Sequence, residues 1–155
     1  MRSRRSIVKN ATRTLKNKSS NKSSNKSSKF EREIVCKFLE MLNTIKVYHW
    51  KTYSYATHKA TDELYSNLGK KTDKFVEILL GKFGNRANLI NTKSIPVKDM
   101  TSPEEFKREI NKYKTYLVGL TSNPAMKVMS NTDLFNIRDD MLGDLNQFLY
   151  LQTLN

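Results

Sequence analysis

Hydrophobic residues recur every three or four positions through most of the chain after residue 29, which is the spacing of amphipathic helices. Four stretches with this spacing are predicted as helices, and they span residues 30–51, 57–80, 103–119 and 132–152. No stretch has the alternation of hydrophobic and polar residues that a half-buried strand requires. The pattern therefore predicts an all-α protein.

Residues that begin or end helices lie at the expected boundaries. Ser102-Pro103-Glu104-Glu105 has the spacing of a capping box, with proline at the first helical position. The second helix is expected to stop before Gly81 and Gly84, because glycine favours a helix end. Asn131 or Thr132 is the expected cap of the last helix.

The connection between the second and third helices is long, at about twenty residues, and such a connection can reach from one end of a helix bundle to the other. The second and third helices would then run in the same direction, as they do in ferritin-like folds. We expect residues 30–155 to form a ferritin-like four-helix bundle with this crossover. The alternative is a plain up-down bundle with an enlarged loop.

Positive charge is concentrated at the N-terminus. The chain has a net charge of +13, yet residues 1–29 contain ten basic residues and no acid. These basic residues are Arg2, Arg4, Arg5, Lys9, Arg13, Lys16, Lys18, Lys22, Lys26 and Lys29. Residues 17–28 repeat Asn-Lys-Ser-Ser and offer nothing hydrophobic to bury, so we expect a disordered arm.

A disordered cationic arm neutralises phosphates and releases counterions, which favours DNA binding without sequence preference. The arm has no aromatic residue before residue 29, so contact with the DNA backbone is expected rather than base stacking. Two other interpretations stay open: a solubilising tail without a fixed partner, and an organelle presequence, since residues 1–16 are rich in arginine and free of acids.

Composition excludes some classes of protein. No run of about 18 hydrophobic residues could span a bilayer, and no hydrophobic segment of a secretory signal follows the basic start. We therefore expect an intracellular protein with no membrane partner. Cys36 is the single cysteine, so it cannot form a disulfide within the chain, and its place in a hydrophobic pattern favours a buried thiol.

Five residues are candidate ligands of a metal ion, and they include both histidines of the chain. They are His49, His58, Asp62, Asp73 and Glu77. At 100° per residue, the last four lie on or at the edge of one stripe of the second helix, about 130° from its hydrophobic stripe. Hydrophobic residues are interspersed among these acids, so we expect a second helix to cover the stripe.

One chain cannot complete this site. Asp62 and Asp73 lie about 16 Å apart along a helix, whereas the ligands of one ion converge within a few ångströms. If two copies cross antiparallel near Gly69, Asp62 of one comes opposite Asp73 and Glu77 of the other, and two equivalent sites form. A short connection between the first two helices would add His49. Such a ligand set suits Fe(II), Mn(II) or Zn(II), and iron is the ion among these that offers oxidation chemistry.

Three motifs together resemble the signature of Dps, the DNA-binding mini-ferritins of starved cells. They are Tyr48-His49-Trp50, His58-x-x-x-Asp62 and Asp73-x-x-x-Glu77. The resemblance covers roughly residues 34–80 and extends weakly to residues 134–151. It implies an inter-subunit ferroxidase centre, with the first two motifs from one subunit and the third from its two-fold mate.

The resemblance further implies a hollow dodecameric shell that oxidises Fe(II), preferentially with hydrogen peroxide, and stores the ferric mineral. Trp50 matches the family tryptophan that absorbs oxidising equivalents beside the site. Two departures are visible. The segment Lys51-Thr52-Tyr53-Ser54-Tyr55 is shorter than its counterpart and lacks the usual glycine and phenylalanine, and Ile78 replaces a basic residue that often follows the last glutamate.

The sequence thus predicts a Dps-like, DNA-associated ferroxidase that protects or condenses DNA. One alternative is a non-enzymatic DNA-condensing or virion protein on the same fold, since a composition rich in lysine and asparagine is typical of AT-rich genomes such as those of large DNA viruses. The other is a helical interaction module without a nucleic-acid role, imported into an organelle.

Overall fold

The computed structural model describes residues 29–84, 86–127 and 130–154. Residues 29–51 are helical and are called the N-terminal helix below. The other helices are α2 (Tyr55–Phe83), α3 (Pro103–Gly119), the short α4 (Pro124–Lys127) and α5 (Thr132–Leu151), with a 3-10 turn over Leu120–Ser122. All regular structure in these ranges is helical, which confirms the all-α prediction.

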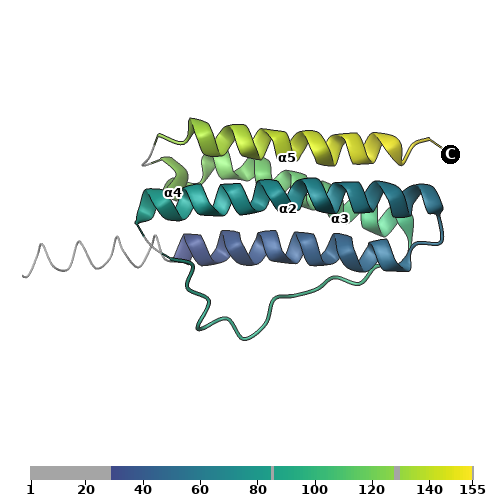
Figure 1. Ribbon diagram of the computed structural model, residues 1–155, viewed down its shortest axis with the longest axis horizontal. Coiled ribbons are helices and arrows are strands. Elements are labelled where there is room, and N and C mark those ends of the chain that lie inside the picture. The colour runs from purple at the N-terminus through teal and green to yellow at the C-terminus, as the bar shows by residue number, and fades with distance from the viewer. Residues whose placement is uncertain (1–28, 85, 128–129, 155) are drawn as a thin grey trace, which may run out of the picture.

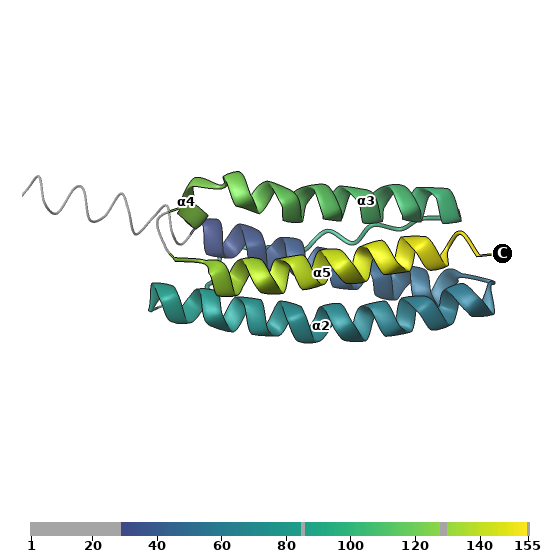
Figure 2. The same cartoon turned by 90° about the horizontal axis from the view of Figure 1, so that it is seen from above.

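The long helices lie side by side along one direction (Figures 1 and 2). The N-terminal helix and α2 meet at the end of the molecule where α5 also finishes, and the segment between α2 and α3 returns along the outside to that same end. As the colours in Figure 1 show, α2 and α3 therefore run in the same direction.

The expected arm lies almost wholly outside the described residues. Lys29 is the exception, and it belongs to the N-terminal helix, where its side chain pairs with Glu33 at 3.6 Å. Lys29 is thus already helical, one residue before the expected start of the first helix at residue 30, and its side chain lies one helical turn from its partner.

Capping residues explain where α2 and α3 begin and where α2 ends. The backbone N–H of Glu105 donates to Ser102 Oγ, and the carboxylate of Glu105 accepts from the N–H of Ser102, so the predicted capping box is present. Ser54 Oγ caps α2 by accepting from the Thr57 N–H. Helix α2 passes through the expected stop and ends at Gly84, whose φ of 67° is left-handed.

The last helix begins where the sequence predicts, although its cap differs. Asn131 occupies the cap position, but its side chain makes no capping hydrogen bond. The Asn131 amide instead donates to the carbonyl of Met126, which ties α5 to the short α4. Tertiary contact has thus replaced local capping at this residue.

The hydrophobic core holds the helices together through aromatic contacts. Phe38 on the N-terminal helix meets Phe75 on α2 edge to face, with ring centres 5.3 Å apart. Tyr48 stacks on Phe106 of α3 at 3.9 Å, and Phe106 in turn meets Phe148 of α5 at 5.7 Å. The hydrophobic stripe predicted for α2 is buried. The stripe that carries His58, Asp62, Asp73 and Glu77 faces outward, and it is called the outward stripe below.

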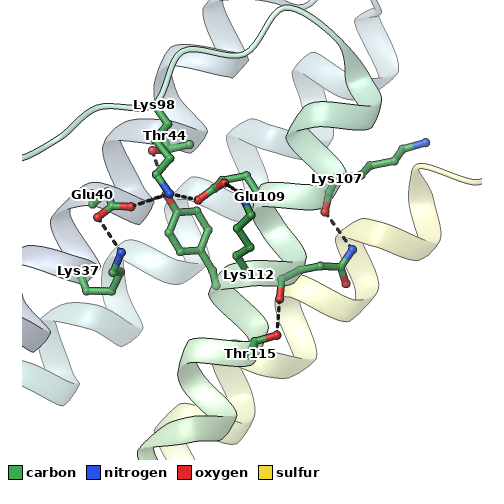
Figure 3. A network of polar contacts seen from close by, with 10 residues as sticks. Lys37, Glu40, Thr44, Lys98, Lys107, Glu109, Lys112 and Thr115 are labelled. Carbon is green, nitrogen blue, oxygen red and sulfur yellow. Dashed lines mark hydrogen bonds and ion pairs between the residues drawn. The ribbon is translucent and has the colours of Figure 1, made fainter.

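The segment that connects α2 to α3 is held against the N-terminal helix and α3 by polar contacts. Lys98 reaches inward and pairs with two buried carboxylates, Glu40 at 3.3 Å and Glu109 (Figure 3). Thr92 Oγ1 lies 3.9 Å from the sulfur of Cys36, which is half-buried rather than fully buried as expected. These contacts hold the connecting segment against the two helices.

Within the described ranges, no helix is both long enough and hydrophobic enough to span a membrane.

Candidate metal centre

The two histidines meet where the N-terminal helix turns into α2. Their rings stack with centres 3.9 Å apart and planes inclined by 25°. The contact joins the end of one helix to the first turns of the next, and only residues 52–54 lie between the two helices. The short connection therefore brings His49 and His58 together despite the nine positions that separate them.

Two reciprocal hydrogen bonds orient these rings. Nδ1 of His49 lies 3.0 Å from the carbonyl oxygen of His58, and Nδ1 of His58 lies 3.0 Å from the carbonyl oxygen of His49. Because a carbonyl oxygen can only accept, each Nδ1 carries the hydrogen and donates it. Each Nε2 of a neutral ring is then left with its lone pair. A metal-binding histidine is oriented in the same way by its second nitrogen.

Thr61 supports the buried member of the pair. His49 is only 6% exposed, and its Nδ1 lies 3.2 Å from Thr61 Oγ1. The single hydroxyl hydrogen of Thr61 is shared between the carbonyls of Thr57 and His58, at 2.8 and 3.0 Å, so the hydroxyl oxygen is available to accept from His49. The ring of His49 is thus fixed by α2 on one side.

Asp62 stands one helical turn after His58 and brings a carboxylate to the pair. Its Oδ1 lies 3.8 Å from Nε2 of His49, and its side chain is 59% exposed. The same oxygen lies 3.5 Å from the ammonium of Lys46. His49, His58 and Asp62 therefore gather at one end of the outward stripe of α2, beside a lysine.

Asp73 and Glu77 are not brought to this cluster. Both side chains are exposed on α2. Asp73 lies about 16 Å further along the helix axis than Asp62, and Glu77 lies one turn beyond Asp73. Neither has an ion-pair or hydrogen-bond partner within the part of the chain that the structure describes. Their position one turn apart leaves two carboxylates side by side on an open surface.

No group of three or more His, Cys, Asp or Glu side chains among the described residues is arranged to hold a metal ion. One chain supplies a histidine pair with one carboxylate, and separately a carboxylate pair. The five candidate ligands thus form two parts on one helix face.

Trp50 is 69% exposed, so it is not a core residue. It follows His49 at the end of the N-terminal helix, and the ammonium of Lys46 lies 5.9 Å from the centre of its ring. Tyr53 and Tyr55 in the connection to α2 are also exposed. Three exposed aromatic side chains therefore lie between the two histidines in the sequence.

Sequence reasoning missed Lys46 and Thr61. The spacing could have identified both residues, because residues three positions apart on a helix lie on the same face. Lys46 stands three residues before His49, and Thr61 stands three residues after His58. Neither is a typical metal ligand, so a search for ligands passed over them.

Comparison with known proteins gives one match. A family described only as of unknown function (DUF5856) matches residues 49–151, which is more than half of the chain. The chain belongs to this family. The DUF5856 region begins at His49 and contains all five candidate ligands, whereas Lys46 and the basic arm lie outside it. No curated protein and no solved structure matches the chain.

Proposed function

We propose that the protein is a Dps-like ferroxidase on a ferritin-like four-helix bundle, and that two copies pair through the outward stripe of α2 to form two iron sites. The path of the chain supports the fold assignment. The segment after α2 returns along the outside, so α2 and α3 run in the same direction, which a ferritin-like crossover requires (Figure 1).

The outward stripe of α2 is suited to antiparallel pairing with itself. In one register four pairs face each other: Tyr55 with Leu80, His58 with Glu77, Asp62 with Asp73, and Ser66 with Gly69. A Cβ added to Gly69 would meet nothing within 4 Å in one chain, so this position faces open space. The small side chains at the centre would let the two helices approach closely. The candidate ligands flank these small residues on both sides, and the hydrophobic pair of Tyr55 with Leu80 lies at each end of the interface. A two-fold axis makes the two halves equivalent.

Each proposed site combines His49, His58 and Asp62 of one copy with Asp73 and Glu77 of the other. Two imidazoles and three carboxylates suit Fe(II), and Mn(II) or Zn(II) would also fit. Asp62 and both distal acids are exposed in one chain, so they are free to converge on an ion when two copies pair. Two Fe(II) ions each give up one electron, and hydrogen peroxide takes up both with two protons, so its O–O bond breaks and two waters form.

One observation carries this proposal: the reciprocal hydrogen bonds of the histidine pair. They direct both Nδ1 atoms to backbone carbonyls and leave both Nε2 atoms as bases, with that of His49 only 3.8 Å from a carboxylate. A purely structural histidine pair has no need of an adjacent exposed carboxylate, whereas a metal site does.

A complementation experiment tests the proposal. Iron-dependent peroxide consumption should fall by at least about tenfold in both His58→Ala and Asp73→Ala, because each variant loses a ligand from every site. When the two variants are co-expressed in equal amounts, half of the pairs are mixed, and each mixed pair keeps one intact site. Activity should then return to about a quarter of the wild-type value.

Glu63→Ala is the matched control, because Glu63 is an exposed acid on α2 that lies beside the stripe rather than on it. It should retain full activity. Circular dichroism checks that each variant keeps its helices. Co-expression that restores nothing would show that the two residues do not serve one inter-subunit site, and unchanged activity in the single variants would exclude the ferroxidase.

A second function, DNA binding through the basic arm, is proposed from charge alone. The arm contributes ten of the 28 basic residues when Lys29 is included, and no acid. If the metal sites serve only structure, the same arm would make the protein a non-enzymatic DNA-condensing or virion component. The peroxide assay separates these two possibilities.

A further inference from the structure

The Asp62 carboxylate already has a cation beside it within one chain. Lys46 Nζ lies 3.5 Å from Asp62 Oδ1, the oxygen that also lies 3.8 Å from Nε2 of His49. The ammonium therefore occupies the neighbourhood in which a metal ion would contact both ligands. The five candidate ligands alone do not explain why a lysine ammonium lies at this position.

Aromatic rings hold the Lys46 ammonium at this position. It lies 4.9 Å from the centre of the Tyr65 ring on α2 and 5.9 Å from that of Trp50 on its own helix. Such cation–π contacts favour a positive charge over the ring face. The side chain of Lys46 is 28% exposed, so its flexible stem can carry the ammonium outward to water.

We propose that Lys46 is a built-in competitor for the metal ion: it neutralises Asp62 in the free chain and has to swing away when a divalent cation binds. This inference rests on the proposed function. A divalent cation in contact with Asp62 and His49 would lie within a few ångströms of the ammonium, where like charges repel strongly. Lys46 therefore weakens metal binding and limits it to ions that bind well enough to displace the ammonium.

The consequence can be measured without iron oxidation. Zn²⁺ is redox-inactive and fits the same ligand types, so titration of the full-length protein with Zn²⁺ by calorimetry reports affinity directly. Removing the competing charge in Lys46→Met should tighten Zn²⁺ binding by about fivefold, the effect expected of one partly exposed ion pair. The His58→Ala variant gives the background from other sites.

Trp50 supplies a second readout because it is the only tryptophan in the chain. Zn²⁺ should change the tryptophan emission of the wild-type protein as the ammonium leaves the ring, and this change should be absent in Lys46→Met. Lys93→Met is the matched control. Lys93 is exposed in the segment between α2 and α3, away from all five candidate ligands in the sequence, so this substitution removes the same charge from elsewhere and should leave affinity within about twofold of wild type.

Lys46→Arg keeps the positive charge and should also bind Zn²⁺ within about twofold of wild type. This variant provides the test if Lys46→Met does not fold, because a large gain in affinity with the charge retained would overturn the proposal. If Lys46→Met binds Zn²⁺ no more tightly than the wild-type protein does, the proposed role of Lys46 is overturned, whereas the proposed metal site is not. Absence of Zn²⁺ binding above the His58→Ala background in every variant would overturn the proposed site itself.

Discussion

Glu40 and Glu109 are buried acids whose charge is balanced by lysines (Figure 3). Burial by itself would raise the pKa of Glu40, but ion pairs with Lys37 and Lys98 outweigh burial and hold it below its ordinary value of 4.5. Lys98 and Lys112 lower the pKa of Glu109 in the same way. The two carboxylates in turn raise the pKa of Lys98 above 10.5, against the opposing effect of burial. One lysine of the segment between α2 and α3 thus pairs with acids on two helices.

Lys98→Met should lower the free energy of unfolding at pH 7 by about 1–2 kcal/mol, because Lys98 is partly open to water and each carboxylate keeps a second lysine. The two carboxyl groups have lowered folded-state pKa values, so their stabilisation is present above pH 4.5 and is lost as pH falls through the folded values. The stabilisation that comes from the charged Lys98 is present below pH 10.5 and is lost as pH rises through the raised pKa of Lys98.

Chemical denaturation at several pH values checks this prediction, with Lys93→Met as the control. Lys93 is an exposed lysine in the same segment. The wild-type protein should lose more stability than Lys98→Met does between pH 5 and strongly acidic pH. Equal effects of the two substitutions would mean that Lys98 does not hold the segment.

At the scale of elements, α2 extends past the residue at which sequence alone stops it. Gly81 lies inside the helix, is exposed, and would bring an added Cβ near nothing within 4 Å. Gly84 ends the helix with a left-handed φ of 67° and donates its N–H to the carbonyls of Gly81 and Leu80. Two glycines three residues apart therefore have opposite roles.

Alanine substitutions should shift stability in opposite directions at these positions. Gly81→Ala should raise the free energy of unfolding by about 0.5–1 kcal/mol, because alanine loses less backbone entropy in a helix. Gly84→Ala should lower it by about 1 kcal/mol, because a side chain disfavours the left-handed backbone. Thermal and denaturant unfolding of both variants measures the difference, and a stabilising Gly84→Ala would contradict the assigned end of α2.

For the whole molecule, charge divides the chain into two parts. The basic arm carries ten positive charges with Lys29, and the remaining 126 residues carry eighteen basic and fifteen acidic groups. A nearly balanced helical part has little general attraction for phosphates, so salt-dependent DNA binding is expected to come from the arm.

Replacing the nine basic residues before Lys29 with glutamine should abolish retardation of double-stranded DNA in gels and leave iron oxidation intact. This variant keeps the length of the arm, so it separates charge from chain length, and deletion of residues 2–28 should give the same result. Mass photometry of both variants should show the same assembly as the wild-type protein. DNA binding that survives the charge replacement would assign the interaction to the helical part.

Local sequence signals predicted most helix boundaries. The limits 103–119 agree with α3 because a capping box and a proline fix its start, and 132–152 agrees with α5 within one residue. The end of α2 was predicted too early because glycine weakens a helix without always ending it. The hydrogen bond of Asn131 to Met126 was not predictable, since it depends on how α4 packs.

Sequence alone determined the helices, the outward stripe of α2 and the candidate ligands on it, because helical periodicity depends only on neighbouring residues. Tertiary structure decided that His49 and His58 stack, that both rings donate to backbone carbonyls, and that Lys46 stands beside Asp62. Those contacts depend on how the three residues between the N-terminal helix and α2 turn the chain. The physical reason is range: spacing fixes which face a residue occupies, whereas packing between helices fixes what that face meets.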